Sequence, residues 1–123
     1  MRNFTALLRL ALPVLFWLGL ALVTLLALMP GSAVPPALLF WDKAQHSLAF
    51  ALLAINGCLA FPRLLGRVCL GLLLHGITLE CLQSLFSLSR YGDIYDALAD
   101  GLGVVLGYAL YKFCAKRRQP GPL

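Results

Sequence analysis

The uncharged run from Leu10 to Met29 limits most strongly how this chain can fold. It holds twenty consecutive residues without an acidic or basic side chain, and Thr24 is its most polar member. A helix of that length rises about 30 Å, the thickness of the hydrocarbon core of a bilayer. Gly31-Ser32-Ala33 offers small residues for signal-peptide cleavage, but the run is longer than the roughly 7–15 apolar residues of a signal peptide. We therefore favour an uncleaved transmembrane helix.

The composition of the whole chain agrees with a membrane location. Of its 123 residues, 61% are hydrophobic and 12% are charged, whereas soluble domains carry about 25% charged residues. Intrinsic disorder needs the opposite balance of low hydrophobicity and high charge. The formal net charge is +5, but the basic residues gather at the ends of apolar runs, so nucleic-acid binding is not expected.

Three further apolar segments follow the first and are separated by turns rich in proline, glycine and serine. The sequence predicts an all-α, four-helix transmembrane bundle with helices at about 10–29, 40–61, 67–88 and 94–115. The bundle forms a single domain over residues 10–115. A short segment, residues 1–9, precedes the bundle, and a basic tail, residues 116–123, follows it.

The distribution of basic residues predicts the orientation of this bundle. With both termini in the cytoplasm, eight basic residues lie inside: Arg2, Arg9, Arg63, Arg67, Lys112, Lys116, Arg117 and Arg118. Only Lys43 and Arg90 then lie outside. This bias follows the positive-inside rule and predicts a multi-pass protein of the cytoplasmic membrane.

In this orientation, the polar residues collect in the outer half of the membrane. The start of the second helix, the end of the third and the start of the fourth all lie there, and they carry every acidic residue of the chain. We expect an outward-facing polar pocket. Its candidate residues are Asp42, Lys43, His46, Glu80, Gln83, Arg90, Asp93, Asp96 and Asp100.

The fourth helix shows the pattern most clearly. Asp93, Asp96, Asp100, Gly103 and Gly107 follow one another at steps of 3, 4, 3 and 4 residues, so they share one helix face. The two glycines allow a neighbouring helix to approach closely. The stripe predicts a polar pocket above a tightly packed floor.

Charged residues at this depth need partners, because a charge at mid-bilayer costs about 2.5–3.5 kcal/mol on insertion scales. Glu80 with Arg90, and Asp96 with Lys43 or His46, are the pairs we expect. His75 lies on another face of its helix, so we expect a satisfied interior histidine outside the site.

Other interpretations of the polar residues remain open. His46 with several carboxylates could bind a divalent metal, but the chain has no compact motif such as His-Glu-x-x-His, so no metal or cofactor is assigned. No nucleophile or triad can be identified from the spacing, so the catalytic residues stay unknown. The polar set could also be a structural staple that holds the helices together.

Four motifs resemble those of VanZ-like membrane proteins. The segment from Asp42 to Phe50 has the pattern Asp-Lys-x-x-His-x-x-x-Phe, and Glu80-x-x-Gln83 follows on the next helix. Arg90-Tyr91-Gly92-Asp93-Ile94-Tyr95-Asp96 resembles the family's Arg-x-x-Asp-x-x-Asp turn, and Gly101-x-Gly103-x-x-x-Gly107 resembles its glycine-rich last helix. The chain departs from the family at Asp100, where an asparagine is usual.

The resemblance implies a small membrane protein of the cell envelope. The founding member is associated with reduced susceptibility to teicoplanin-type glycopeptides. The expected partners are membrane lipids and a lipid-linked cell-wall precursor or lipoglycopeptide, with a homo-oligomer as a further option. We expect the pocket to bind or modify an envelope lipid or to modulate the antibiotic response. The alternatives are a small enzyme acting on a lipid-linked substrate and the structural staple.

Overall fold

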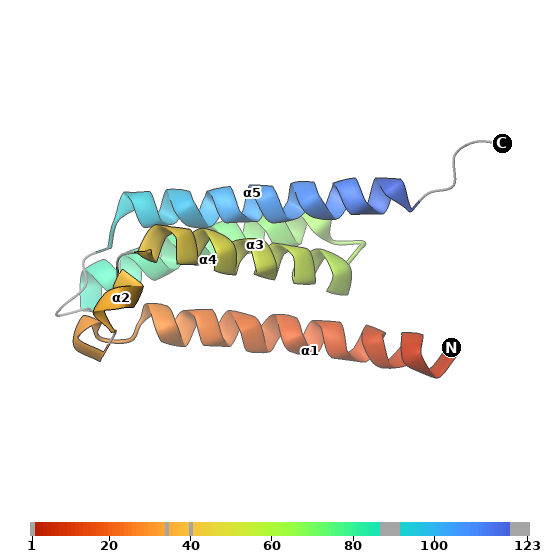
Figure 1. The fold of residues 1–123 in the computed structure, drawn as a ribbon, viewed down its shortest axis with the longest axis horizontal. Coiled ribbons are helices and arrows are strands. Elements are labelled where there is room, and N and C mark those ends of the chain that lie inside the picture. Colours follow the sequence, from red (N-terminus) through yellow and green to blue (C-terminus); the bar gives the residue numbers. More distant parts are fainter. Residues whose placement is uncertain (1, 34, 40, 87–91, 119–123) are drawn as a thin grey trace.

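The computed structural model describes residues 2–33, 35–39, 41–86 and 92–118, and this part of the chain is all-helical. Its four long helices are α1 (Arg2–Ala27), α3 (Asp42–Ala60), α4 (Leu65–Phe86) and α5 (Ile94–Arg117). A 3₁₀ turn (Gly31–Ala33) and the short helix α2 (Pro36–Leu39) lie between α1 and α3. The long helices lie side by side in one elongated bundle (Figure 1). The start of α1 and the end of α5 lie at the same end of it.

Three of the four long helices are long and apolar enough to cross a membrane: Phe4–Ala27 within α1, and all of α4 and α5. Large side chains such as Leu18, Leu25 and Leu102 are exposed on the outside of the bundle, as expected where lipid replaces water. The shorter helix α3 is not among these candidate spans, because its first two turns carry five polar residues. The all-α prediction is confirmed, and three of the four expected spans have the required length and composition.

Helix α1 is longer at its start than the sequence predicted. It begins at Arg2 rather than near residue 10, so Pro13 lies inside the helix and not in its first turn. The residues before the uncharged run, from Thr5 to Leu8, are compatible with a helix, and the charge of Arg9 does not interrupt it. The absence of charged residues therefore marks where the apolar run begins, but it does not mark where the helix begins.

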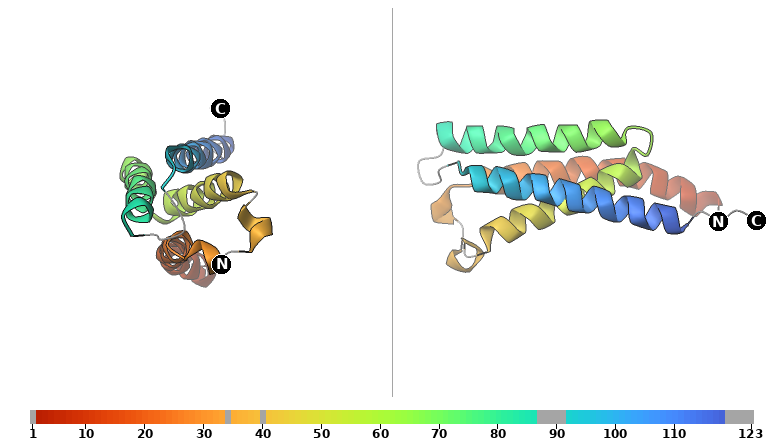
Figure 2. Two further views of the ribbon diagram at one scale, coloured as in Figure 1. Left: turned by 90° about the vertical axis from the view of Figure 1, so that its left-hand side faces the viewer. Right: turned by 90° about the horizontal axis from the view of Figure 1, so that it is seen from above.

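Helix α3 lies at the centre and contacts the other three long helices, as the end-on view shows (Figure 2). Its buried residues include Phe50, Ala54 and Cys58. The most extensive contact is with α5, where Gly103 and Gly107 lie against the backbone of α3. A Cβ atom at Gly107 would lie 2.9 Å from the Cβ of Ala54. Both glycines thus lie where α3 and α5 approach each other closely.

Candidate functional site

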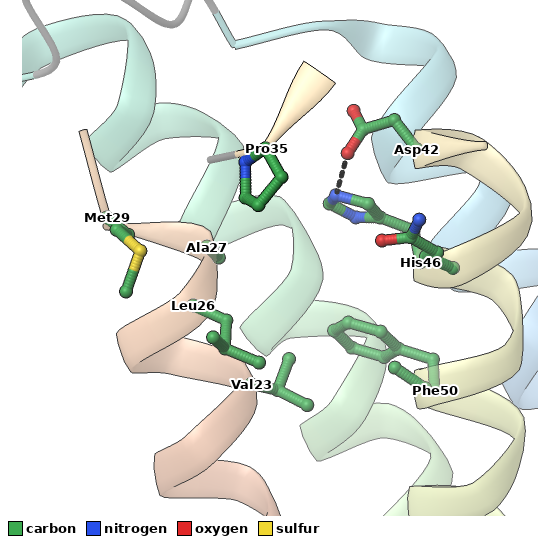
Figure 3. A pocket seen from close by; sticks show the side chains of 10 residues that line it. Val23, Leu26, Ala27, Met29, Pro35, Asp42, His46 and Phe50 are labelled. Carbon is green, nitrogen blue, oxygen red and sulfur yellow. Dashed lines mark ion pairs between the residues drawn. The ribbon is translucent and has the colours of Figure 1, made fainter. Parts of the chain in front are cut away.

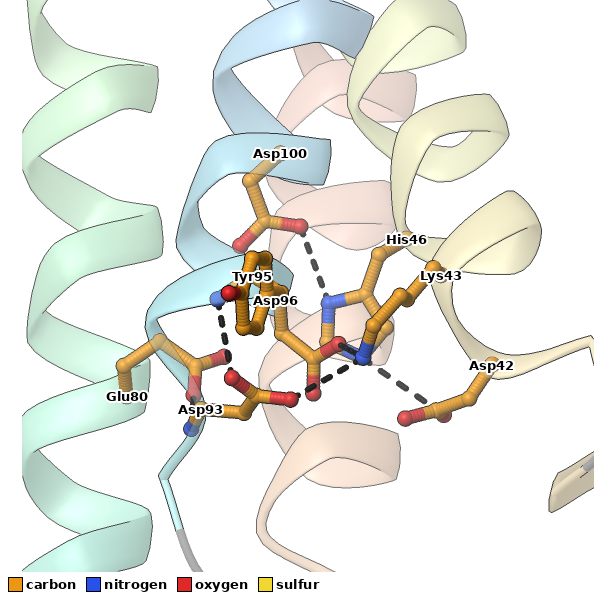
Figure 4. A network of polar contacts seen from close by, with 8 residues as sticks. All are labelled: Asp42, Lys43, His46, Glu80, Asp93, Tyr95, Asp96 and Asp100. Atoms are coloured by element: carbon orange, nitrogen blue, oxygen red, sulfur yellow. Dashed lines mark hydrogen bonds and ion pairs between the residues drawn. The ribbon is translucent and has the colours of Figure 1, made fainter.

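The polar residues gather at the end of the bundle where α3 and α5 begin and α4 ends (Figure 4). Helices α3 and α5 start at this end and run in the same direction (Figure 1). One helical turn along α3 is therefore matched by one turn along α5. This parallel arrangement places Lys43 beside Asp96, and His46 beside Asp100.

Lys43 connects the first turns of the two helices. Its Nζ donates to Asp93 Oδ2 at 3.0 Å and to Asp96 Oδ1 at 2.9 Å. The expected pair of Asp96 with Lys43 is thus confirmed. Because the Lys43 ammonium group pairs with two carboxylates, its positive charge is balanced within the cluster.

Asp93 is the N-cap residue of α5. Its Oδ1 accepts a hydrogen bond from the backbone N–H of Tyr95 at 2.9 Å, which satisfies one of the free donors at the start of the helix. The pKa of Asp93 is lowered, first by this hydrogen bond and then by the hydrogen bond from Lys43. Asp93 is therefore ionised at neutral pH.

His46 forms a pair with a buried carboxylate. Its Nδ1 lies 2.9 Å from Asp100 Oδ1, and its Nε2 lies 3.8 Å from Asp42 Oδ1. Asp100 is only 1% exposed. The sequence suggested Asp96 as a partner of His46, but the register of α3 and α5 places His46 one turn deeper, beside Asp100.

Glu80 ties the end of α4 to the start of α5. Its Oε2 accepts the backbone N–H of Asp93 at 2.8 Å. The expected partner of Glu80, Arg90, lies outside the described residues. Two buried oxygens, Glu80 Oε1 and Asp100 Oδ2, have no hydrogen-bond partner among the residues that the structure describes.

Gln83 is hydrogen-bonded to α1 rather than to the carboxylates. Its Nε2 donates to the backbone carbonyl of Ala27 at 2.7 Å, and the residue is buried. Ala27 is the last residue of α1, where helix carbonyls lack intrahelical donors. The structure thus gives Gln83 the role of attaching α1 to α4.

His75 is also away from the cluster, as expected. Its Nε2 lies 3.0 Å from Thr24 Oγ1, so it forms a second link between α4 and α1. The prediction of a satisfied interior histidine is confirmed.

An apolar pocket of about 250 Å³ adjoins the cluster between α1 and α3 (Figure 3). Leu26, Val23 and Phe50 form much of its wall, while Asp42 and His46 lie at its polar end. The sequence did not reveal this pocket, because a leucine-rich helix offers no pattern that separates pocket residues from lipid-facing ones. His46 belongs to both the pocket and the carboxylate cluster.

The cluster contains two groups of residues whose side chains could hold a metal ion. One comprises Asp42, His46 and Asp96, and the other His46, Glu80 and Asp100. Within each group, one donor atom from every residue lies within 4.8 Å of the others. A histidine held by a carboxylate can also accept or donate a proton.

Comparison of the chain with family models, curated proteins and solved structures gave no match. The resemblance to VanZ-like proteins therefore rests on the four motifs alone. The functional interpretation depends on the geometry of the cluster and its pocket.

Proposed function

We propose that this chain is a multi-pass protein of the cytoplasmic membrane that binds an amphipathic, lipid-linked ligand of the cell envelope. The observation that carries this proposal is the position of His46. Its ring lines the apolar pocket between α1 and α3, and its Nδ1 contacts the buried Asp100. One site thus offers an apolar surface and a polar surface side by side.

The size of the pocket suits a segment of a lipid better than a whole ligand. Its volume of about 250 Å³ is below the roughly 300–1,000 Å³ of sites that enclose a small molecule. Under this proposal, part of an acyl or isoprenoid chain contacts Leu26 and Phe50, while the rest stays in the bilayer. The head group then lies at Asp42 and His46.

The charge of the cluster suggests which head groups fit. Five carboxylates lie at this end of the bundle, and the nearby Lys43 is already shared between Asp93 and Asp96. Carboxylate oxygens accept hydrogen bonds and repel phosphate. We therefore favour a head group rich in hydroxyl, amide or amino donors, such as the sugar or peptide of a lipid-linked cell-wall precursor.

The orientation of the bundle belongs to the same proposal. We place both termini in the cytoplasm and the cluster in the outer half of the membrane, with α3 as a fourth, central span. The excess of basic residues near the termini and at the α3–α4 turn supports this orientation. In this arrangement, a VanZ-like protein would meet cell-wall precursors and teicoplanin-type glycopeptides on the face where they occur.

A second candidate function is catalysis on the same ligand. The contact between His46 and Asp100 supports it, because a carboxylate that orients an imidazole is a common arrangement for proton transfer. A purely structural staple is the remaining alternative. It accounts for the contacts of Lys43 and Gln83 but not for the apolar pocket.

The proposal can be tested by ligand-induced thermal shifts of the full chain in detergent with EDTA present. The ligands are undecaprenyl-linked precursors, phospholipids and a lipoglycopeptide, and the variants are His46→Gln and His75→Gln. We expect a precursor to raise the Tm of the wild type and of His75→Gln, but not of His46→Gln. Absence of a shift with every ligand, or equal shifts in both variants, would reject the site.

A further inference from the structure

We propose that His46, Glu80 and Asp100 form a binding site for one divalent transition-metal ion, of the Zn²⁺ or Mn²⁺ type. This site goes beyond the proposed lipid ligand and does not depend on it. The three side chains come from three different helices, α3, α4 and α5, and converge inside the bundle (Figure 4). The sequence offers no compact motif for such a site, because each helix contributes a single ligand.

The spacing of the donor atoms fits one ion. One donor atom from each of the three residues lies within 4.8 Å of the other two. His46 Nδ1 and Asp100 Oδ1 are 2.9 Å apart. Two ligand atoms at about 2.1 Å from one ion are separated by about 3.0 Å at an octahedral angle and by about 3.4 Å at a tetrahedral angle. The hydrogen-bonded histidine and aspartate therefore already have the spacing of neighbouring octahedral ligands, and would separate slightly around a tetrahedral ion.

Two buried oxygens point independently to a missing partner. Glu80 is 7% exposed and Asp100 is 1% exposed. Glu80 Oε1 and Asp100 Oδ2 lack a hydrogen-bond partner within residues 2–33, 35–39, 41–86 and 92–118. An unsatisfied buried polar group costs about 1–3 kcal/mol, and more if it is charged. A cation bound between the two carboxylates would remove this cost.

The charges around the two carboxylates also favour a cation. Lys43 contacts Asp93 and Asp96 rather than Glu80 or Asp100. A divalent ion would balance the charges of Glu80 and Asp100 together. Buried carboxylates in proteins are stabilised by such pairing or by metal coordination.

The surroundings hold the ligands in position. The backbone N–H of Asp93 fixes Glu80 Oε2 at 2.8 Å. Asp42 Oδ1 lies 3.8 Å from Nε2, the second ring nitrogen of His46. Metal-bound histidines commonly donate the other ring N–H to a carboxylate, which fixes the ring and its tautomer; Asp42 lies next to that nitrogen, although beyond hydrogen-bond distance. A mixed set of one imidazole and two carboxylates suits zinc and manganese better than calcium.

Metal binding can be measured directly on the full chain, purified in detergent with a tag that lacks histidine and stripped with EDTA. Equilibrium dialysis against Zn²⁺, Mn²⁺, Mg²⁺ and Ca²⁺ reports stoichiometry and affinity. We expect one Zn²⁺ or Mn²⁺ per chain and weaker binding of Mg²⁺ and Ca²⁺. Glu80→Gln and Asp100→Asn should weaken binding at least about tenfold, while circular dichroism verifies that they remain helical.

Asp93→Asn distinguishes a metal site from diffuse attraction to acidic residues. It removes a charge from the same cluster but no proposed ligand, so it should weaken binding less than Glu80→Gln does. Equal losses in the two variants, or no bound metal in the folded wild type, would overturn the proposal. Absence of bound metal would indicate that protons, and not a metal ion, satisfy the buried carboxylates.

A spectroscopic measurement keeps the proposal testable if the carboxylate variants fail to fold. The chain has two histidines, His46 and His75. Electron spin echo envelope modulation of bound Mn²⁺ should show directly coordinated nitrogen in the wild type and in His75→Gln, and none in His46→Gln. If the wild type shows no nitrogen coupling, His46 is not a ligand. The lipid proposal is tested separately, because its thermal shifts are recorded in EDTA.

Discussion

At the scale of single residues, the position of Asp100 depends on a glycine of the neighbouring helix. A Cβ atom at Gly76 would lie 2.9 Å from Asp100 Oδ2 and 3.1 Å from Asp100 Cβ. Gly76 therefore allows α4 to approach the buried carboxylate. Its spacing from Glu80 could be read from the sequence, but its contact with Asp100 depends on the packing of α4 against α5.

Gly76→Ala should destabilise the bundle by about 1–3 kcal/mol, because an extra methyl group overpacks a tight contact. Gly71→Ala on the same helix is the matched control, since nothing lies within 4 Å of a Cβ atom there. The control should be neutral or slightly stabilising, because alanine has the higher helix propensity. Equal stability of the two variants in detergent unfolding experiments would contradict the contact.

Asp93 should make the folding stability of the protein depend on pH in the acidic range. Its pKa in the folded state is below its unfolded value of about 3.9. The unfolded state therefore binds more protons in the window between the two values, and the contribution of Asp93 to stability rises with pH through that window. It is fully present above the unfolded pKa and is lost as pH falls through the folded pKa.

A comparison of wild type with Asp93→Asn isolates this effect from the other carboxylates. The difference in Tm should be largest near neutral pH and should shrink below about pH 4. Thermal unfolding followed by circular dichroism gives both values. A Tm difference that is the same at every pH would show that the carboxylate charge does not contribute.

At the scale of helices, the parallel packing of α3 against α5 sets the site. The glycine stripe of α5 was visible in the sequence because helical spacing alone places its members on one face. The partner of each polar residue was not visible, because register depends on how deep the glycines sit against α3. The sequence therefore left Lys43 and His46 as alternative partners of Asp96, and it did not identify Asp100 as the partner of His46.

Gly103→Ala should separate the two helices, because a Cβ atom there would lie 2.9 Å from the carbonyl carbon of Ser47. We expect a loss of about 1–3 kcal/mol or more. Gly101→Ala is the control on the same helix, since its Cβ atom would meet Leu73 at an ordinary 3.5 Å. Helix separation should also weaken ligand-induced stabilisation in Gly103→Ala only. Retained stability in Gly103→Ala would show that the helices can adjust without cost.

At the scale of the whole molecule, the apolar runs were sufficient to predict a helical membrane protein. They did not predict that one of the four long helices, α3, would differ from the other three. Helix α3 contacts the other three long helices, and the polar residues of its first turns keep it from being apolar enough to count as a candidate span. The pocket between α1 and α3 could not be predicted either, because it arises from the spacing between two helices.

Reporter fusions test the proposed orientation. The start of α1 and the end of α5 lie at one end of the bundle, so both should lie on the same side of the membrane (Figure 1). A fluorescent protein at the C-terminus should be active, and alkaline phosphatase there should be inactive. Alkaline phosphatase inserted between α1 and α3 should be active. The reverse pattern would place the cluster on the cytoplasmic side.

The central claim is that the apolar pocket and the polar cluster together hold a lipid-linked ligand, and native mass spectrometry tests it most directly. Leu26 lines the pocket, whereas Leu25 is 68% exposed on the same helix outside the pocket lining. The account predicts a bound precursor on the wild type and on Leu25→Trp, and its loss from Leu26→Trp. Equal ligand occupancy of the two tryptophan variants would contradict the claim.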